Sequence, residues 1–391
     1  MRVLFTVWSW PTHLYPLVPV AWAFRGAGHE VLVAVQPALV PQVQRAGLPS
    51  APIGTDVTDR ALLSGALMAA QQAARPDPQR PRLQVSVRMA EAMIDDLLEL
   101  ARRWRPDLIV SEPTTYAAPL ACAVLGIPYA RYVWGIDVHS AAREHEPAAF
   151  APLCARLGLA GFDARGTVTL DPCPERLQIP GEGRRQQVRF VPYNGPGAMP
   201  SWLLERPARP RVCVTGGLSR AQRGPAADEP ESLIRRAVRA LAPLDVEVVA
   251  AVSAADRLTL RNEGGDQVPN VRIAELLPLQ LLLPSCDVVL APGGNGTMMT
   301  AVMCGVPQVC VPQQRADDLG AAQLEKTGAG IRIADSAASP VALRDAVERV
   351  LGQPGYGHAA RALRAQAQRR PSLRTAVAGL ERLVAQGCEA G

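Results

Sequence analysis

The sequence has little lysine and few aromatic residues. Of its 41 basic residues only Lys326 is a lysine, and the three large aromatic types together make up 4% of the chain. The formal charge is only +5, and the arginines are spread along the chain without interleaved aromatics. Because nucleic-acid binding depends on a concentrated basic surface, we expect no nucleic-acid partner. The arginine excess, together with 36 prolines, is better explained by a GC-rich genome.

The sequence also lacks a long apolar run and a paired cysteine motif. No stretch reaches about 18 consecutive apolar residues, so we expect no membrane span. The N-terminus runs directly into a strand pattern, so we expect no signal peptide. None of the eight cysteines forms a C-x-x-C pair, and no cluster has metal-ligand spacing. These features predict reduced thiols in a cytoplasmic protein.

Short β-branched runs instead alternate with longer helical stretches, which is typical of parallel α/β sheets. The 391 residues are enough for two domains with separate cores. We expect helices near 17–26, 88–104 and 295–302. We expect strands at 3–7, 30–35, 108–111, 129–133, 211–215, 246–252, 271–273, 287–290 and 308–311.

Turn-forming residues at Val191–Gly197 predict a linker between two halves. The predicted fold class is therefore α/β, with two Rossmann-like, doubly wound domains facing across a cleft. Residues 54–84 are polar and rich in proline, so we expect a loop or short helices there, over the cleft. In such sheets, ligands bind beyond the carboxyl ends of the strands. The expected site loops are those after Val7, Ser111, Val133, Thr215, Leu290 and Val311.

The strongest local motif is Gly293-Gly294-Asn295-Gly296-Thr297, which follows a predicted strand and opens a helix. Glycines allow close approach of the backbone to a ligand, and a helix N-terminus attracts a diphosphate. A tight turn without a ligand is the alternative. The loop is not a Walker motif, and no dinucleotide fingerprint follows the first strand. Gly216 and Gly217, after another strand, form a second candidate phosphate contact.

His13 follows the first predicted strand, where a histidine suits general-base catalysis near neutral pH. Glu112 and Asp137 follow two other strands and are the candidate acidic partners. Asp317 and Asp318 follow the strand at 308–311 and could accept hydrogen bonds from sugar hydroxyls, although solvated loop charges are the alternative. Near the first-half strand ends, the aromatic residues that could line an acceptor pocket are Trp8, Trp10, Tyr15 and Trp134.

Together these motifs resemble the GT-B glycosyltransferases of bacterial natural-product biosynthesis, in glycosyltransferase family 1. The resemblance covers essentially the whole chain. Within the family it is greatest to actinobacterial polyketide and macrolide deoxysugar transferases such as the spinosyn rhamnosyltransferase. The segments that carry it are Thr12–Pro16, Ala27–Val31, Leu170–Pro174, Val191–Gly195, Gly293–Thr297 and Gly305–Gln308.

The resemblance implies an inverting transfer of a deoxysugar from a dTDP-sugar to a hydroxyl of a hydrophobic polyketide-type aglycone, with no other cofactor and no obligatory metal. Residues 1–200 would bind the acceptor, with His13 as base, and 206–370 the nucleotide sugar. Residues 371–391 would form a helix on the N-terminal domain. The implied nucleotide contacts include Leu276 and Leu279, and the implied sugar contacts are Asp317 and Asp318. Whether the chain forms a homodimer is left open.

Two positions depart from the family pattern. Many relatives have His-His before the glycine loop, where this chain has Ala291 and Pro292, so one phosphate contact is absent. The family's Asp-Gln pair is Asp317-Asp318 here, which replaces an amide donor with an acceptor. Both changes affect the choice of sugar more than the reaction.

Three alternatives stay open on the sequence alone. In C-glycosylation of an aromatic polyketide, Asp137 would be the base. A nucleotide-sugar epimerase would need no acceptor. A non-catalytic partner that binds nucleotide sugars would fit the proline at 292. A dinucleotide-dependent oxidoreductase is disfavoured, because the glycine fingerprint is missing.

Overall fold

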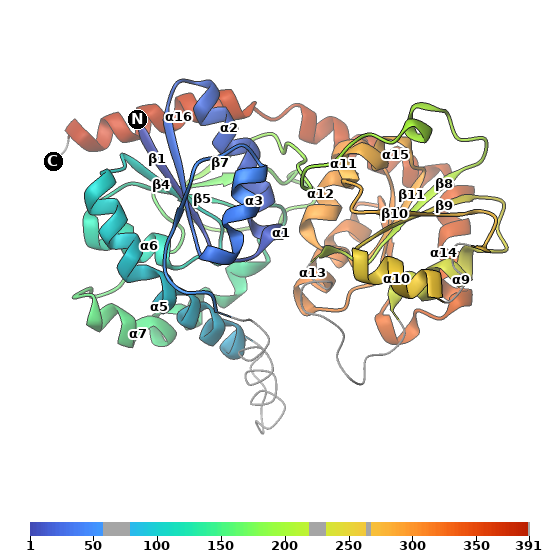
Figure 1. The fold of residues 1–391 in the computed structure, drawn as a ribbon, viewed down its shortest axis with the longest axis horizontal. Coiled ribbons are helices and arrows are strands. Elements are labelled where there is room, and N and C mark those ends of the chain that lie inside the picture. The colour runs from blue at the N-terminus through green and yellow to red at the C-terminus, as the bar shows by residue number, and fades with distance from the viewer. Residues whose placement is uncertain (58–78, 219–231, 263–266, 390–391) are drawn as a thin grey trace. The chain divides into compact units, whose positions relative to one another are not determined.

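The computed structural model describes residues 1–57, 79–218, 232–262 and 267–389. The chain forms two α/β units, each built around one parallel sheet (Figure 1). The first unit comprises Met1–Pro172, Pro180–Val188 and Pro371–Gly391, and the second Cys173–Ile179 and Arg189–Arg370. The stretch expected as a linker, Val191–Gly197, therefore belongs to the second unit. The expected doubly wound α/β architecture is confirmed in both units.

The first sheet has seven parallel strands in the order β3-β2-β1-β4-β5-β6-β7. Their bounds are β1 Arg2–Val7, β2 Glu30–Val35, β3 Ser50–Pro52, β4 Leu108–Ser111, β5 Tyr129–Tyr132, β6 Val168–Asp171 and β7 Arg185–Gln187. The sequence did not predict β3, β6 and β7. Two of these are three-residue edge strands, and β7 is entirely polar, so neither carries a hydrophobic pattern.

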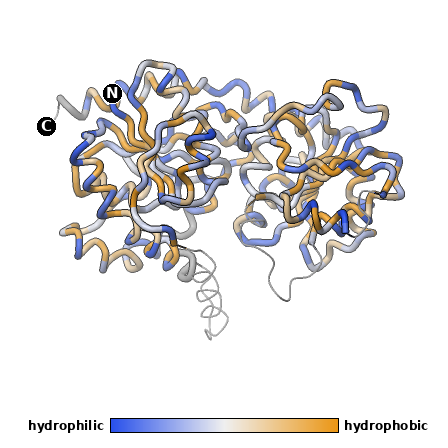
Figure 2. The backbone as a smooth tube through the Cα atoms, in the orientation of Figure 1, coloured by the Kyte–Doolittle hydropathy of each residue, from blue (hydrophilic) through white to orange (hydrophobic). Residues whose placement is uncertain are grey.

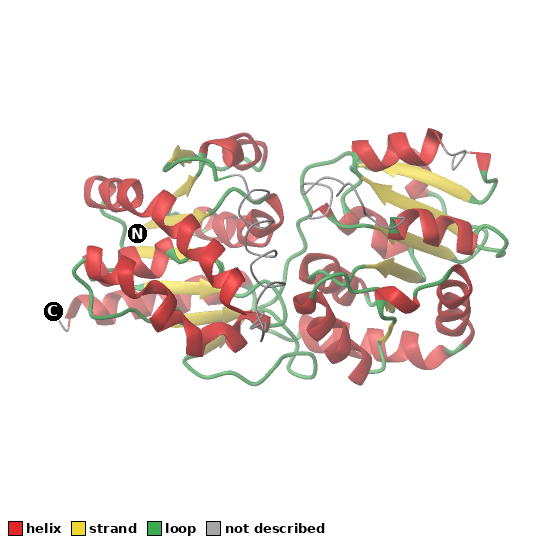
Figure 3. Cartoon of the chain, turned by 90° about the horizontal axis from the view of Figure 1, so that it is seen from below, coloured by secondary structure: helices red, strands yellow, loops and turns green. Residues whose placement is uncertain are grey.

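Helices cover both faces of this sheet (Figure 3). They are α1 Pro11–Leu14, α2 Val18–Gly26, α3 Val40–Arg45, α5 Gln79–Trp104, α6 Ala117–Leu125, α7 Glu146–Arg156 and α16 Leu373–Glu389, with 3₁₀ turns at Tyr15–Leu17, Pro37–Leu39 and Val138–His145. Helix α5 begins nine residues earlier than expected. Residues 58–78 of the expected loop lie outside the described residues.

The second sheet has six parallel strands in the order β10-β9-β8-β11-β12-β13. Their bounds are β8 Arg211–Thr215, β9 Glu247–Val252, β10 Val271–Glu275, β11 Val288–Ala291, β12 Gln308–Cys310 and β13 Gly330–Arg332. Helices also lie on both sides of this sheet (Figure 3). They are α9 Leu233–Leu241, α10 Ala254–Asn262, α11 Leu279–Leu282, α12 Asn295–Cys304, α13 Arg315–Lys326, α14 Pro340–Gly352 and α15 Pro354–Gln368, with 3₁₀ turns at Ser201–Leu204, Leu283–Ser285 and Asp335–Ala337.

The core of each unit follows its central strands, which are orange along their length in Figure 2. Strands β4 and β11 are buried at every residue, because helices cover both faces of a parallel sheet. In the first unit, one apolar cluster joins the sheet to α5, α6 and α7. In the second unit, separate clusters fill the two faces of the sheet. This burial makes the strands a rigid support for the loops at their ends.

The strand order places one reversal in each sheet, where the chain changes its direction of winding. In the first sheet the reversal lies between β1 and β4, which pair from Val3 to Thr6. In the second it lies between β8 and β11. The loops after such neighbouring strands diverge and leave a crevice at their carboxyl ends. These two edges are therefore the places to look for ligand-binding residues.

The C-terminal helix α16 packs against α2 in the first unit. His29 Nε2 lies 2.8 Å from Glu381 Oε1, and Gln186 Nε2 donates to the carbonyl of Ala376 at 3.3 Å. Leu380, on the same helix, is fully buried. Within the described ranges, the structure has no helix long and apolar enough to cross a membrane.

Candidate active site and nucleotide site

His13 lies at the reversal point of the first sheet. Strand β1 ends at Val7, and Pro11 then starts the short helix α1, because proline suits the first helical position. The N–H of His13 donates to the carbonyl of Trp10 at 3.0 Å, which holds His13 within the first turn. The imidazole is thereby presented close to the carboxyl ends of both β1 and β4.

Thr114, after β4, connects His13 to Glu112. Thr114 Oγ1 lies 3.1 Å from His13 Nδ1 and donates to both carboxylate oxygens of Glu112 at 2.9 Å. His13 Nδ1 is 3.6 Å from Glu112 Oε2, beyond a good direct hydrogen bond. The predicted pair of His13 and Glu112 is thus brought together, but a threonine hydroxyl lies between them.

The Glu112 side chain is completely buried. Burial alone would raise its pKa, but the nearby positive charge of protonated His13 and the hydrogen bonds from the Thr115 hydroxyl and the Thr114 N–H lower the pKa below its ordinary value overall. The Thr114 N–H donates to Glu112 Oε2 at 2.7 Å, and the Thr115 hydroxyl makes a short hydrogen bond to Oε1. These donors hold Glu112 ionised beside the imidazole.

Three tryptophans lie around this histidine. The ring of Trp8 is 5.0 Å from that of His13 and edge-on to it, while Trp134 is 4.6 Å away and tilted. Trp10 stacks on Trp8 at 5.2 Å. Each tryptophan keeps 9% of its surface exposed. Tyr15 is half-buried, and its burial raises the pKa of the phenol above its ordinary value.

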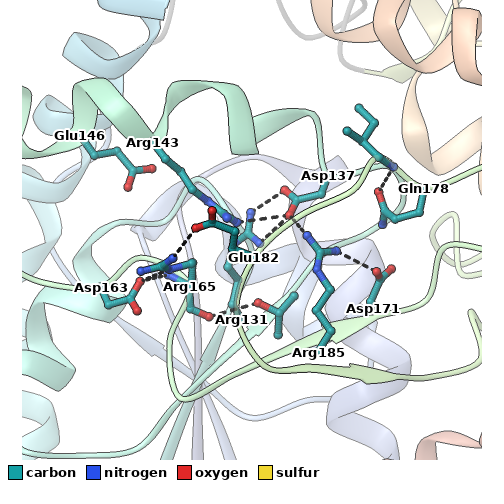
Figure 4. A network of polar contacts seen from close by, with 12 residues as sticks. Arg131, Asp137, Arg143, Glu146, Asp163, Arg165, Asp171, Gln178, Glu182 and Arg185 are labelled. Atoms are coloured by element: carbon teal, nitrogen blue, oxygen red, sulfur yellow. Dashed lines mark hydrogen bonds and ion pairs between the residues drawn. The ribbon is translucent and has the colours of Figure 1, made fainter. Parts of the chain in front are cut away.

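Asp137 is engaged by three arginines (Figure 4). Arg131 donates to both of its oxygens at 3.0 and 2.7 Å, Arg185 at 2.8 Å and Arg143 at 3.4 Å. Burial works against ionisation, but the arginines outweigh it and hold the pKa of Asp137 well below its ordinary value. A fully buried carboxylate with so low a pKa is a poor proton acceptor. These surroundings do not favour the alternative in which Asp137 is the base.

The glycine loop, residues Gly293–Thr297, lies at the reversal point of the second sheet. Gly293 adopts φ +86°, a left-handed conformation that favours glycine, and a Cβ there would lie 3.5 Å from that of Cys310. Gly294 caps α12 without a side chain, and the first turn holds no acidic residue. The first N–H groups of α12 have no partner within the helix, so this end is suited to an anion.

Gly216 and Gly217 follow β8, the neighbour of β11, and so share this edge of the sheet. Gly217 has φ +76°, and its N–H donates to Thr215 Oγ1 at 3.3 Å. Leu276, after β10, is 60% exposed and has φ +49°, while Leu279 begins α11. The two glycines therefore lie next to the glycine loop at the reversal, and the two leucines lie on the β10 side of the same sheet.

The two adjacent aspartates of α13 have different surroundings. A Cβ on Gly294 would be 3.9 Å from Asp317 Oδ1, so Asp317 lies beside the glycine loop. Asp318 instead receives two hydrogen bonds from Arg332, at 2.5 and 2.7 Å. Asp317 therefore lies beside the glycine loop, whereas Asp318 forms an ion pair with Arg332.

Sequence reasoning missed two residues near His13. Thr114 stands only two residues after Glu112, and that spacing is the signal that could have identified it. No motif marks His139 in the sequence, but its ring centroid lies 5.7 Å from that of Trp134. Among the described residues, no group of three or more histidine, cysteine, aspartate or glutamate side chains could hold a metal ion.

The chain is similar to known proteins over nearly its whole length. Residues 22–217 match the N-terminal domain, and residues 235–383 the C-terminal domain, of the family described as erythromycin biosynthesis protein CIII-like. The 10-deoxymethynolide desosaminyltransferase of Streptomyces venezuelae is 37% identical, over 99% of this chain and 98% of that protein. The tylactone mycaminosyltransferase of Streptomyces fradiae is 36% identical, over 98% and 93%.

Two solved structures are also similar over nearly the whole chain. Glycosyltransferase VinC in complex with dTDP has a TM-score of 0.83 and 33% identity, covering 99% of this chain and 100% of that one. Spinosyn rhamnosyltransferase SpnG with thymidine diphosphate has a TM-score of 0.84 and 32% identity, covering 97% and 100%. The predicted GT-B fold is thus confirmed. The chain belongs to the erythromycin biosynthesis protein CIII-like family of antibiotic-biosynthesis glycosyltransferases.

Proposed function

We propose that this enzyme transfers a deoxysugar from a dTDP-sugar to a hydroxyl group of a hydrophobic polyketide-type acceptor, with inversion at the anomeric carbon. The observation that carries the proposal is His13, held at the first reversal point and connected to a buried, ionised Glu112. The macrolactone specificity of relatives such as the 10-deoxymethynolide and tylactone enzymes supports a polyketide acceptor. The small exposed parts of the tryptophans around His13 would supply apolar surface for it.

In this mechanism His13 removes the proton from the acceptor hydroxyl. The oxygen then attacks the anomeric carbon, a C–O bond forms on the face opposite the nucleotide, and the bond to the diphosphate breaks. The negative charge of Glu112 stabilises the imidazolium that results, because the carboxylate stays ionised beside it. The proton leaves His13 to solvent after the product departs.

The glycine loop would stabilise the departing diphosphate. The N–H groups of the first turn of α12 and its dipole favour negative charge there, as in other preorganised anion sites. Pro292 offers neither a side-chain donor nor an N–H, so these backbone groups would act without the histidine that many relatives have. Of the two aspartates, Asp317 is the proposed contact for the sugar, because Asp318 is paired with Arg332.

Two further points are part of the proposal. Thymidine would lie against Leu276–Leu279. Because similar structures contain bound thymidine diphosphate, dTDP is the nucleotide to test first. The cytoplasm would be the site of action, which fits the lack of a disulfide at the seven cysteines whose side chains the structure describes.

The test measures transfer from a dTDP-deoxysugar to macrolactone acceptors such as 10-deoxymethynolide and tylactone, followed by product mass and dTDP release. His13→Ala should lower kcat by about 10²–10⁴-fold, the usual contribution of a general base. The same variant should keep the wild-type thermal shift with dTDP, since His13 belongs to the other unit.

His358→Gln, at an exposed position of α15, is the control and should keep wild-type kcat. Undiminished turnover by His13→Ala would remove His13 as the base. A larger thermal shift with UDP than with dTDP would overturn the proposed donor.

A further inference from the structure

The hydroxyl of Thr114 has three hydrogen-bonding neighbours in the first unit. It contacts Glu112 through both carboxylate oxygens at 2.9 Å and His13 Nδ1 at 3.1 Å. The indole Nε1 of Trp8 lies 2.9 Å from the same oxygen. These three groups come from the loops after β1 and β4, so the hydroxyl joins the two loops at the reversal point.

The direction of each hydrogen bond follows from the chemistry of the partners. A threonine hydroxyl has one proton to donate and two lone pairs to accept with. The indole of Trp8 is always a donor, and an ionised carboxylate is always an acceptor. The single proton of Thr114 therefore goes to Glu112, and one lone pair receives Trp8.

Only a lone pair is left for His13. The contact at 3.1 Å can then be a hydrogen bond only if His13 Nδ1 carries the proton and donates it to Thr114. In neutral imidazole the other nitrogen, Nε2, then has the lone pair and is free of a proton. This is the tautomer that a general base acting through Nε2 requires.

We propose that Thr114 is a positioning residue, which holds His13 in the Nδ1-protonated tautomer and transmits to it the effect of the Glu112 carboxylate. This inference rests on the proposed function, in which His13 is the base. Trp8 shares the role. Its indole N–H donates to one lone pair of the Thr114 oxygen, so the hydroxyl is held in this orientation and does not turn toward solvent.

A direct contact between His13 and Glu112 cannot hold the imidazole in this tautomer. At 3.6 Å it attracts the imidazolium electrostatically, but it is too long to orient the ring. The carboxylate is also occupied by other donors, since Thr115 binds Oε1 and the Thr114 N–H binds Oε2. The threonine hydroxyl therefore orients the imidazole ring, and the carboxylate supplies the negative charge that attracts the imidazolium.

The chain offers a matched pair of variants. Thr114→Val removes the hydroxyl that contacts both His13 and Glu112, and Thr114→Ser restores it. Thr115→Val removes a neighbouring hydroxyl bond to the same carboxylate, but Thr115 has its other contact with the backbone N–H of Trp8 at 3.3 Å. Comparison of the two valine variants separates the effect of losing a hydrogen bond to Glu112 from the effect of losing the hydrogen bond to His13.

The first measurement is the tautomer of His13 by ¹⁵N and ¹³C NMR of histidine-labelled enzyme. The chain has five histidines, and the spectrum of His13→Gln identifies the signal. We expect Nδ1–H in wild type, Thr114→Ser and Thr115→Val, and a shift toward Nε2–H in Thr114→Val. A wild-type enzyme with Nε2–H as its main neutral tautomer overturns the inference, even if no valine variant folds.

The second measurement is kinetic. Thr114→Val should lower kcat about 10–100-fold with little change in KM for the acceptor, because base orientation matters in the transition state. Thr114→Ser should recover most of the loss, and the pH at which kcat reaches half its maximum should change more in Thr114→Val than in Thr115→Val. Undiminished kcat or an unchanged tautomer in Thr114→Val overturns the role of Thr114. Full activity of His13→Ala would instead overturn the proposed function.

Discussion

At the scale of single residues, two histidines contact Trp134 and have different chemistry. His13 has a carboxylate within 3.6 Å, whereas burial lowers the pKa of His139 to about 4. The charges that face His139 act in both directions: Asp137 and Glu112 raise its pKa, and Arg131 and His13 lower it. At neutral pH His139 is therefore an uncharged ring against the indole.

This burial predicts a pH dependence of stability. The unfolded chain has a histidine pKa of about 6.5, so between that pH and about 4 it binds a proton that the folded protein does not. The contribution of His139 to the free energy of unfolding is fully favourable above about pH 6.5 and is lost as the pH falls. His139→Gln should therefore lose less stability than wild type between pH 7.5 and 5, as measured by urea unfolding at each pH. His358→Gln controls for the removal of one histidine, and equal losses in His139→Gln and wild type would contradict the prediction.

At the scale of elements, the first turn of α12 can be compared with that of α15. Gly296 and Gly355 are each the second residue of their helix. Within the described parts of the chain, a Cβ on either meets no atom within 4 Å beyond the helix backbone. Glycine at 296 is therefore not required by packing, and a ligand that approaches the backbone is a physical reason for it.

Gly296→Ala should accordingly fold as well as wild type, or be more stable by up to about 1 kcal/mol from helix propensity. It should nonetheless reduce the thermal shift produced by dTDP, because the new methyl group would meet the diphosphate. Gly355→Ala is the matched control and should keep the full shift. If both alanine variants respond to dTDP like wild type, the diphosphate does not approach the backbone at Gly296.

At the scale of the whole molecule, the chain returns to its first unit at the end. Helix α16 belongs with α2 and β7, although more than 180 residues of the second unit intervene between β7 and α16. The stability of the first unit therefore depends on residues that the chain supplies last. Leu380 is the fully buried anchor on this helix.

Leu380→Ala should lower the stability of the first unit by about 2–5 kcal/mol, the usual cost of such a cavity. Hydrogen exchange should become faster in α2 and β7, and stay unchanged in β8 and β11 of the second unit. Leu258→Ala, at a 63% exposed position on α10, should change little. Faster exchange across both units would indicate that they unfold together.

Much of the framework was predictable from the sequence. The apolar strands β1, β4, β8 and β11 each contain a short β-branched run, and glycine or proline marks the turn that follows most of them. The family motifs added the order in which the elements occur. The edge strands β7 and β13 were missed, because polar or three-residue strands are set by pairing with a neighbour and have no pattern of their own.

The sequence by itself determined that His13, Glu112 and the glycine loop stand at strand ends, since hydrophobic burial dictates where strands begin and end. Only the tertiary structure decided which strand ends are neighbours, because sheet order depends on contacts between distant segments. Thr114 is 101 residues from His13, and the pairing of β1 with β4 brings them together. The same packing places Asp137 among three arginines and Glu112 beside His13. Both carboxylates follow predicted strands, so their positions in the sequence could not reveal this difference.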